Sequence, residues 1–160
     1  SNQLPAITYW LMGSLSGTTQ KDLTIAILPM TLGLAGLFFL RWRINILTLG
    51  DDEAHTIGVN TNLIRLSVIV CSTLITAASV SVSGMIGWVG LVIPHFSRKI
   101  VGNNYKHLMP ASMSLGAIFL LIVDNFSRNL LPTEIPLGIL TSFIGAPFFI
   151  YLLTRKGDSF

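Results

Sequence analysis

The sequence has little charge and a single cysteine. Charged side chains make up 11% of its 160 residues, hydrophobic ones 51%, and its mean hydropathy is +0.70. Soluble domains carry about 25% charged residues, so this composition excludes an ordinary soluble domain. Cys71 has no second cysteine with which to form an intrachain disulfide, and we expect it to pack as a small apolar side chain. The chain is predicted to be an integral membrane protein.

Charge is absent altogether from residues 66–97, a run of 32 residues bounded by Arg65 and Arg98. Because basic residues beside membrane segments favour the cytoplasmic side, both ends of the run are predicted to lie there, which requires an even number of crossings. Two full helices need about 40 residues. We therefore predict one full helix over 66–82, then a reversal and a short returning helix. The reversal is placed at three small residues, Ser83, Gly84 and Gly87.

Three other apolar segments are long enough to span a membrane, at 23–40, 107–126 and 135–153. Residues 4–16 are too short and are interpreted as the end of a helix whose beginning is missing. If these segments cross the membrane in turn, eight basic residues lie on one side of it and two on the other. The larger group is Arg41, Arg43, Arg65, Arg98, Lys99, Lys106, Arg155 and Lys156, and the smaller is Lys21 and Arg128. This division predicts five crossings plus the partial first one, with the C-terminus cytoplasmic.

The expected fold class is thus all-α, as a single polytopic membrane domain over 1–160. The net charge of +3 is attributed to cytoplasmic loops and not to nucleic-acid binding, because no basic and aromatic residues are interleaved.

One polar stretch contains the string GDDEAHTIG, which begins at Gly50. Acidic residues at a helix start complement the positive end of the helix dipole, so we predict a short helix over 51–57 that Gly58 ends. Such a helix between two spans suggests a surface for a soluble partner, and a solvated loop is the alternative. A metal site is a third interpretation, although adjacent helical residues do not converge on one ion. Its candidate ligands are Asp51, Asp52, Glu53 and His55.

Glycines recur every third residue at Gly84, Gly87 and Gly90, ahead of Pro94 and His95. Small residues at this spacing let helices approach closely, and a proline removes one backbone hydrogen bond, so helix packing with a kink is the simpler interpretation. His95 is predicted to lie near the cytoplasmic face, where it caps or contacts a loop. A catalytic role is not expected, because no nucleophile or carboxylate stands at a recognisable spacing.

Asp124 and Arg128 stand four residues apart near the predicted external end of their helix. They are placed to pair with each other. An external arginine runs against the general distribution of basic residues, so a contact with an acidic group of an external partner is the second interpretation. The sequence leaves both open.

Three strings in this order resemble the permease subunits of ABC importers for iron-siderophores, haem and cobalamin. They are TLGDDEAHTIGV at 48–59, SGMIGWVGLVIPH at 83–95 and EIPLGILTSFIGAPFFIYLL at 134–153. The resemblance covers essentially the whole chain but only the C-terminal half of such a permease, which has ten helices. The first four helices and the start of the fifth are therefore missing. Trp88 stands where many relatives carry an aromatic such as Phe.

The resemblance implies three sets of site residues. The coupling segment that docks on the ATP-binding subunit is Gly50, Asp51, Asp52, Glu53, Ala54, His55, Thr56, Ile57, Gly58 and Val59. Docking of the substrate-binding protein is assigned to Arg128 and Glu134. Residues implied to line the pathway and the dimer interface are Gly138, Thr141, Ser142, Gly145 and Pro147.

The resemblance further implies a transporter and not an enzyme. The permease binds no cofactor, and ATP is hydrolysed on a separate ABC ATP-binding subunit. The other expected partners are a periplasmic or lipoprotein substrate-binding protein, a second permease copy or paralogue, and lipid of the inner membrane. A secondary transporter driven by an ion gradient is the alternative, but such proteins place ionisable groups at mid-membrane, and no charged residue lies mid-span here.

Overall fold

The structure is a computed structural model that describes residues 3–133 and 135–158, apart from the side chains of residues 51 and 156–158. Its helices, in chain order, are α1 (Gln3–Met12), α2 (Gln20–Leu47), α3 (Asp51–Ile57), α4 (Thr61–Ser83), α5 (Val89–Val101), α6 (Tyr105–Asn129) and α7 (Leu137–Asp158). Four of them contain stretches long and apolar enough to cross a membrane, namely α2, α4, α6 and residues 137–155 of α7. The all-α, multi-pass fold predicted from the sequence is confirmed.

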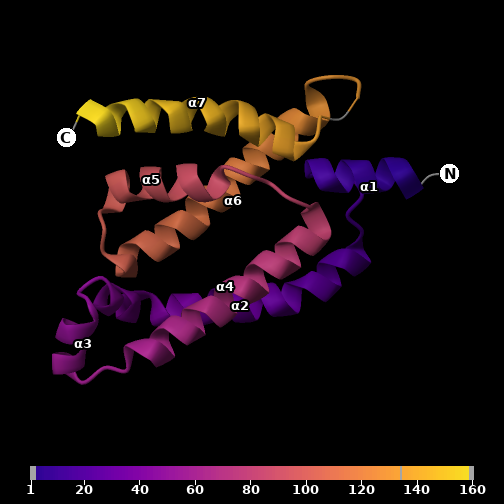
Figure 1. The fold of residues 1–160 in the computed structure, drawn as a ribbon. Coiled ribbons are helices and arrows are strands. Elements are labelled where there is room, and N and C mark those ends of the chain that lie inside the picture. Colours follow the sequence, from indigo (N-terminus) through magenta and orange to yellow (C-terminus); the bar gives the residue numbers. More distant parts are fainter. Residues whose placement is uncertain (1–2, 134, 159–160) are drawn as a thin grey trace.

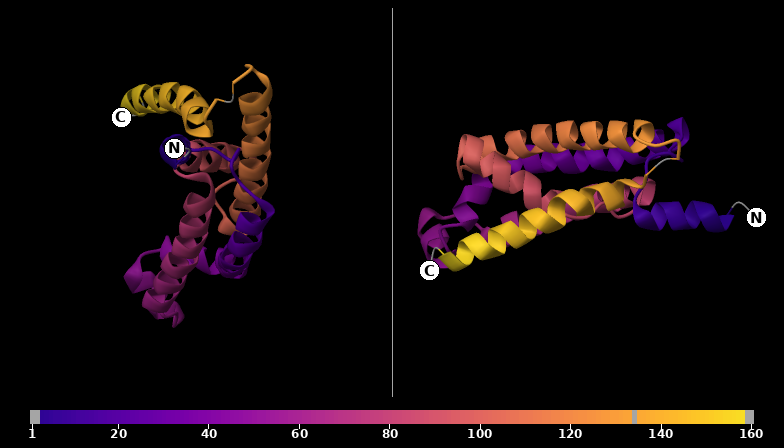
Figure 2. Two further views of the ribbon diagram at one scale, coloured as in Figure 1. Left: turned by 90° about the vertical axis from the view of Figure 1, so that its right-hand side faces the viewer. Right: turned by 90° about the horizontal axis from the view of Figure 1, so that it is seen from above.

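The long helices lie side by side in an open bundle (Figure 1). α4 packs along α2, α6 packs on α2 and α5, and α7 packs on α5 and α6. One end of the bundle holds α3, the α5–α6 turn and the C-terminal end of α7, and we name it the α3 end. The opposite end, named the α1 end, holds α1 and the connection between α6 and α7, as the view from above also shows (Figure 2).

The reversal inside the uncharged run lies where the sequence predicts it. α4 ends at Ser83, and Gly84 caps it with φ +70° and ψ −162°, a conformation that is essentially restricted to glycine. The chain then runs through residues 85–88 into α5, whose 13 residues lead back toward the α3 end. The prediction of one full helix and a short returning helix is confirmed.

α2 is longer than its apolar segment. Thr19 and Asp22 form a capping box at its start, in which the Thr19 Oγ1 accepts from the Asp22 N–H at 3.2 Å and the Asp22 Oδ2 accepts from the Thr19 N–H at 3.0 Å. The apolar segment predicted at 23–40 lies within this helix, which continues past Arg41 to Leu47. No glycine or proline interrupts residues 41–47. The side chain of Arg41 folds back along the helix, so that its guanidinium lies 3.9 Å from the ring centre of Phe38.

Two glycines let α2 and α4 approach closely. A Cβ at Gly36 would lie 2.4 Å from the Cys71 Sγ, and one at Gly33 would lie 2.5 Å from the Ile75 side chain. Because glycine has no side chain, α4 packs directly against the backbone of α2 at these two positions. Cys71 is a free thiol packed against α2, which confirms the apolar role predicted for it.

The helix ends group the basic residues in space as the sequence predicts. The described members of the larger group lie in the terminal turns or adjoining segments at the α3 end, whereas Lys21 begins α2 and Arg128 ends α6 at the α1 end. The predicted cytoplasmic side depends on this distribution.

Candidate functional site

Among the described side chains of α3, that of Ala54 is buried and the others are exposed. Ala54 is 0% exposed, while Asp52, Glu53, His55 and Thr56 are exposed and Ile57 is 58% exposed. Gly50 at its start and Gly58 at its end both have positive φ, at +95° and +85°. The helix predicted at 51–57 is confirmed, and so is its glycine end. Its outer face presents acidic, polar and apolar groups together.

The sequence leaves two alternatives to a docking helix at 51–57, a solvated loop and a metal site. The segment is a regular helix, with the Val59 N–H donating back to the Ala54 carbonyl at 3.3 Å, but its exposed side chains leave open whether it is solvated or meets a partner. The metal-site alternative finds no support among the described side chains, which leave out that of Asp51, since no three His, Cys, Asp or Glu groups converge there.

Asn45, in the last turn of α2, joins α2 to the start of α6. The Asn45 Nδ2 donates to the Asn104 Oδ1 at 2.7 Å, and the Asn45 Oδ1 accepts from the Tyr105 N–H at 2.8 Å. Asn104 is itself the N-cap of α6, accepting from the Lys106 N–H at 3.0 Å. We call this set of contacts the Asn45 clasp. The sequence does not reveal this contact, because Asn104 before a helix is a capping signal but nothing marks its partner 59 positions earlier.

At the α1 end, three chain segments meet at three glycines. A Cβ at Gly84 would lie 1.7 Å from the Trp10 carbonyl oxygen, one at Gly138 would lie 2.0 Å from the Met12 carbonyl oxygen, and one at Gly13 would lie 2.4 Å from the Met85 carbonyl oxygen. We call this the glycine junction. It is held by hydrogen bonds from the Ser14 N–H to the Ser83 carbonyl at 2.9 Å and from the Gly138 N–H to the Gly13 carbonyl at 3.3 Å.

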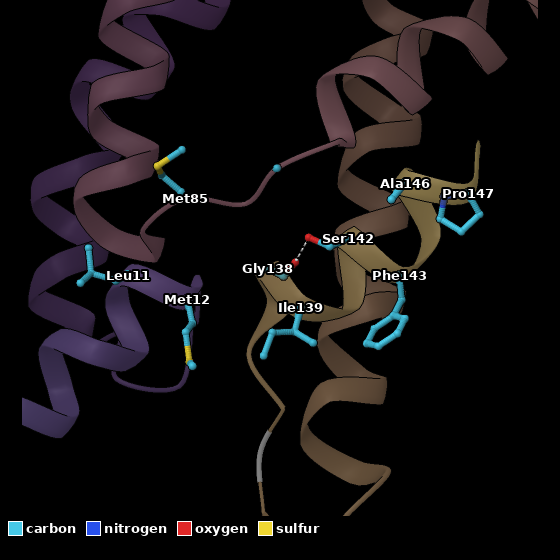
Figure 3. Close-up of a pocket in the computed structure, with 10 residues that line it drawn as sticks. Leu11, Met12, Met85, Gly138, Ile139, Ser142, Phe143, Ala146 and Pro147 are labelled. Carbon is cyan, nitrogen blue, oxygen red and sulfur yellow. Dashed lines mark hydrogen bonds between the residues drawn. The ribbon is translucent and has the colours of Figure 1, made fainter. Parts of the chain in front are cut away.

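A cavity of about 600 Å³ opens beside the glycine junction (Figure 3). α1 and the α4–α5 connection line one side, and α7 lines the other. The lining residues are Leu11, Met12, Met85, Gly87, Gly138, Ile139, Ser142, Phe143, Ala146 and Pro147. Ser142 supplies the hydroxyl of this otherwise apolar lining, and that hydroxyl donates to the Gly138 carbonyl at 2.7 Å. The surface therefore offers little that selects one polar substrate over another.

The α7 residues that the resemblance assigns to the pathway lie on two different faces. Gly138, Ser142 and Pro147 line the cavity. Thr141 is 1% exposed, with its hydroxyl bonded to backbone carbonyls of its own helix, and Gly145 is buried against the Trp88 side chain. Thr141 and Gly145 therefore pack against the rest of the chain and not toward the cavity, because residues four apart share a helix face. The assignment of the five residues to the pathway and the dimer interface stays a prediction.

The close approach predicted for the three glycines at 84–90 occurs at one of them. Gly84 lies in the glycine junction, but a Cβ at Gly87 or Gly90 would meet no described atom within 4 Å. The three do not share one helix face, since α4 ends before Gly84 and α5 begins only at Val89. Pro94 does lie inside α5, as the predicted helix requires.

His95 faces α7 and not a loop, so its predicted capping role is wrong. Its ring packs edge-on against Phe148, with ring centres 5.3 Å apart, and against its neighbour Phe96 at 5.9 Å. Its Nε2 is buried without a hydrogen-bond partner among the described residues. The side chain therefore serves as an aromatic contact between α5 and α7.

Arg128 forms the local ion pair that its spacing predicts. Its Nε donates to the Asp124 Oδ2 at 3.0 Å, and its Nη2 reaches the Leu15 carbonyl at 3.5 Å. The side chain is still 48% exposed at the α1 end, so the ion pair leaves part of the guanidinium open to a second carboxylate. Glu134, the other residue assigned to docking, lies outside the described residues.

Curated proteins that are similar to this chain are described as permeases of transport systems. A protein of Helicobacter pylori described as an iron chelatin transport system permease is 47% identical over 94% of this chain and 46% of its own length. The molybdate import system permease protein MolB of Haemophilus influenzae is 44% identical over 97% of this chain and 47% of its own length. The chain thus spans about half the length of these curated relatives.

A solved structure shows the same helix arrangement. It is described as an inward-facing conformation of a metal-chelate type ABC transporter, and it matches with a TM-score of 0.89 and 43% identity over 97% of this chain and 50% of that one. The model of the FecCD transport family matches residues 1–155. This chain belongs to the FecCD transport family.

Proposed function

We propose that this chain is part of the permease subunit of an ABC importer that moves a metal chelate across the inner membrane. The observation that carries the proposal is α3, a helix exposed at the basic end of the bundle, in which Ala54 is the buried one among the described side chains. This helix is proposed to receive a separate ATP-binding subunit, on which ATP is hydrolysed. The permease then converts nucleotide-driven closure into alternating access by a shift between two states.

The opposite end is proposed to receive a periplasmic or lipoprotein substrate-binding protein through Arg128 and Glu134. The half-exposed guanidinium beside Asp124 supports this, because a partner's carboxylate can bind it without breaking the local pair. A second permease copy or paralogue is proposed to cover the cavity face of α7, where Phe143 is 76% exposed. The C-terminus of α7 is then cytoplasmic.

The substrate class is proposed to be a metal chelate of the iron-siderophore, haem or cobalamin type. Relatives carry names that specify iron chelatin, cobalamin or hemin, and one specifies molybdate. The apolar lining of the cavity supports a pathway that leaves recognition to the binding protein.

The test is uptake by the complete permease, purified with its ATP-binding subunit and reconstituted in liposomes. Vesicles with ATP either inside or outside are mixed with the binding protein and with one of four radiolabelled substrates, namely ferric siderophore, hemin, cobalamin and molybdate. We expect ATP-dependent accumulation of one chelate, unaffected by protonophores and sodium ionophores. Accumulation that needs an ion gradient and no ATP would establish the secondary-transporter alternative. Selective uptake of molybdate would refute the chelate assignment alone.

A further inference from the structure

The Asn45 clasp joins the segment that leads into α3 to the start of a different helix. Asn45 stands two residues before the end of α2, and its own carbonyl accepts from the Thr48 N–H at 3.2 Å. The Leu49 N–H donates to the Ile46 carbonyl at 3.1 Å, and the Ala54 N–H donates to the Gly50 carbonyl at 3.1 Å. Successive hydrogen-bonded turns therefore connect Asn45 with α3, so a displacement of α3 also moves the end of α2.

On the other side of the clasp is the N-terminus of α6. The first backbone N–H groups of a helix have no partner within the helix. In α6 the N–H of Lys106 is satisfied by Asn104, whereas the N–H of Tyr105 is satisfied by Asn45 from α2. The α6 cap is thus shared between two helices. When the end of α2 moves, α6 must either follow or lose part of its cap.

α6 runs the length of the bundle to Arg128 at the α1 end. The chain of contacts from α3 through Asn45 into α6 is therefore a physical connection between the two surfaces to which partners are assigned above. α6 also packs on α2 directly, but the clasp is the hydrogen-bonded contact between the α2 end and the α5–α6 turn.

We propose that Asn45 is a positioning residue that transmits movement of α3 to α6, and so links ATP hydrolysis on the partner to substrate transfer. The inference rests on the proposed function and adds to it a residue that touches neither ATP, nor substrate, nor the binding protein. Its role is to keep the α6 N-terminus in register with the coupling helix.

The test compares substrate transported per ATP hydrolysed in the complete reconstituted transporter, with the radiolabelled ferric siderophore as the probe. Asn45→Ala removes the two clasp hydrogen bonds that the Asn45 side chain makes, to Asn104 and from Tyr105. We expect the transported amount per ATP to fall about fivefold, at the low end of couplings between distant sites. ATP hydrolysis by the assembled transporter continues. Asn103→Ala is the matched control, because Asn103 is exposed in the same turn and makes no side-chain hydrogen bond among the described residues.

A second pair of variants keeps the test decisive if Asn45→Ala does not assemble. Asn104→Ala removes the acceptor for both Asn45 and Lys106, whereas Asn104→Asp retains an acceptor for each. We expect Asn104→Ala to uncouple transport and Asn104→Asp to keep the wild-type ratio. A merely structural role would lower the yield of assembled transporter and leave the ratio unchanged.

The outcomes separate the two proposals. If the wild-type transporter shows no ATP-dependent uptake of any probe, the proposed function fails and the inference fails with it. If the wild type transports the chelate but Asn45→Ala and Asn104→Ala keep its transport per ATP, the proposed function stands and the role of Asn45 is refuted.

Discussion

Replacing Gly84 with alanine tests whether the glycine junction holds the α1 end together. The backbone at Gly84 has φ +70° and ψ −162°, a region in which a non-glycine residue costs about 1–3 kcal/mol. The new Cβ would lie 1.7 Å from the Trp10 carbonyl oxygen, closer than real Cβ contacts allow, so α1 has to move away from the end of α4.

That movement breaks three hydrogen bonds that hold the junction. They run from the Ser14 N–H to the Ser83 carbonyl (2.9 Å), from the Trp10 Nε1 to the Ser81 carbonyl (3.2 Å), and from the Gly138 N–H to the Gly13 carbonyl (3.3 Å). Each contributes about 0.5–1.5 kcal/mol. Together with the backbone strain, the free energy of unfolding is expected to fall by about 2.5–7.5 kcal/mol.

The assay is the thermal stability of the complete permease in detergent, followed as the fraction that remains monodisperse after heating. Gly87→Ala is the matched control. It lies in the same connection, has no positive φ, and its Cβ would meet no described atom within 4 Å. We expect Gly87→Ala to melt near or slightly above the wild type, because alanine restricts the unfolded chain. Equal midpoints for Gly84→Ala and Gly87→Ala would refute the junction.

Three further predictions concern the surfaces and the helix interface. Arg128→Glu is expected to weaken binding-protein affinity about tenfold at low salt and less at high salt, measured by surface plasmon resonance; an unchanged affinity would limit Arg128 to its local ion pair. Reversing the exposed charges with Asp52→Lys and Glu53→Lys is expected to abolish uptake while the permease stays folded, and unchanged transport would remove the coupling role from α3. Gly36→Leu is expected to separate α2 from α4 at Cys71 and to lower stability by about 1–3 kcal/mol in the same melting assay, and an unaltered midpoint would contradict the close packing.

Local signals in the sequence predicted much of the fold. The α3 helix, the reversal at Gly84 and the ion pair of Arg128 each depend on residues within a few positions of one another, through helix ends, backbone freedom and the spacing of one helical turn. Hydropathy placed the four long helices. Hydropathy did not predict that α2 continues past Arg41, because charge marks the edge of the membrane and not the end of a helix.

What the sequence did not predict joins positions far apart in the chain. The Asn45 clasp and the glycine junction bring together segments that are tens of residues apart, and nothing local tells which carbonyl will face a given glycine. The α7 residues show the same limit. Helical spacing separates Thr141 and Gly145 from Gly138 and Ser142, but only the position of α5 and α6 decides which face turns inward.

The shortness of α5 also constrains how the protein is made. Thirteen helical residues extend about 20 Å, less than the roughly 30 Å of the hydrocarbon layer, so the α4–α5 connection ends at a depth where lipid would surround it. Peptide groups there have to be shielded by protein. α1 and the start of α7 supply that shield, and α7 is the last of these helices to leave the ribosome. The α4–α5 connection is therefore fully shielded only once α7, which follows it in the chain after α5 and α6, has packed beside it.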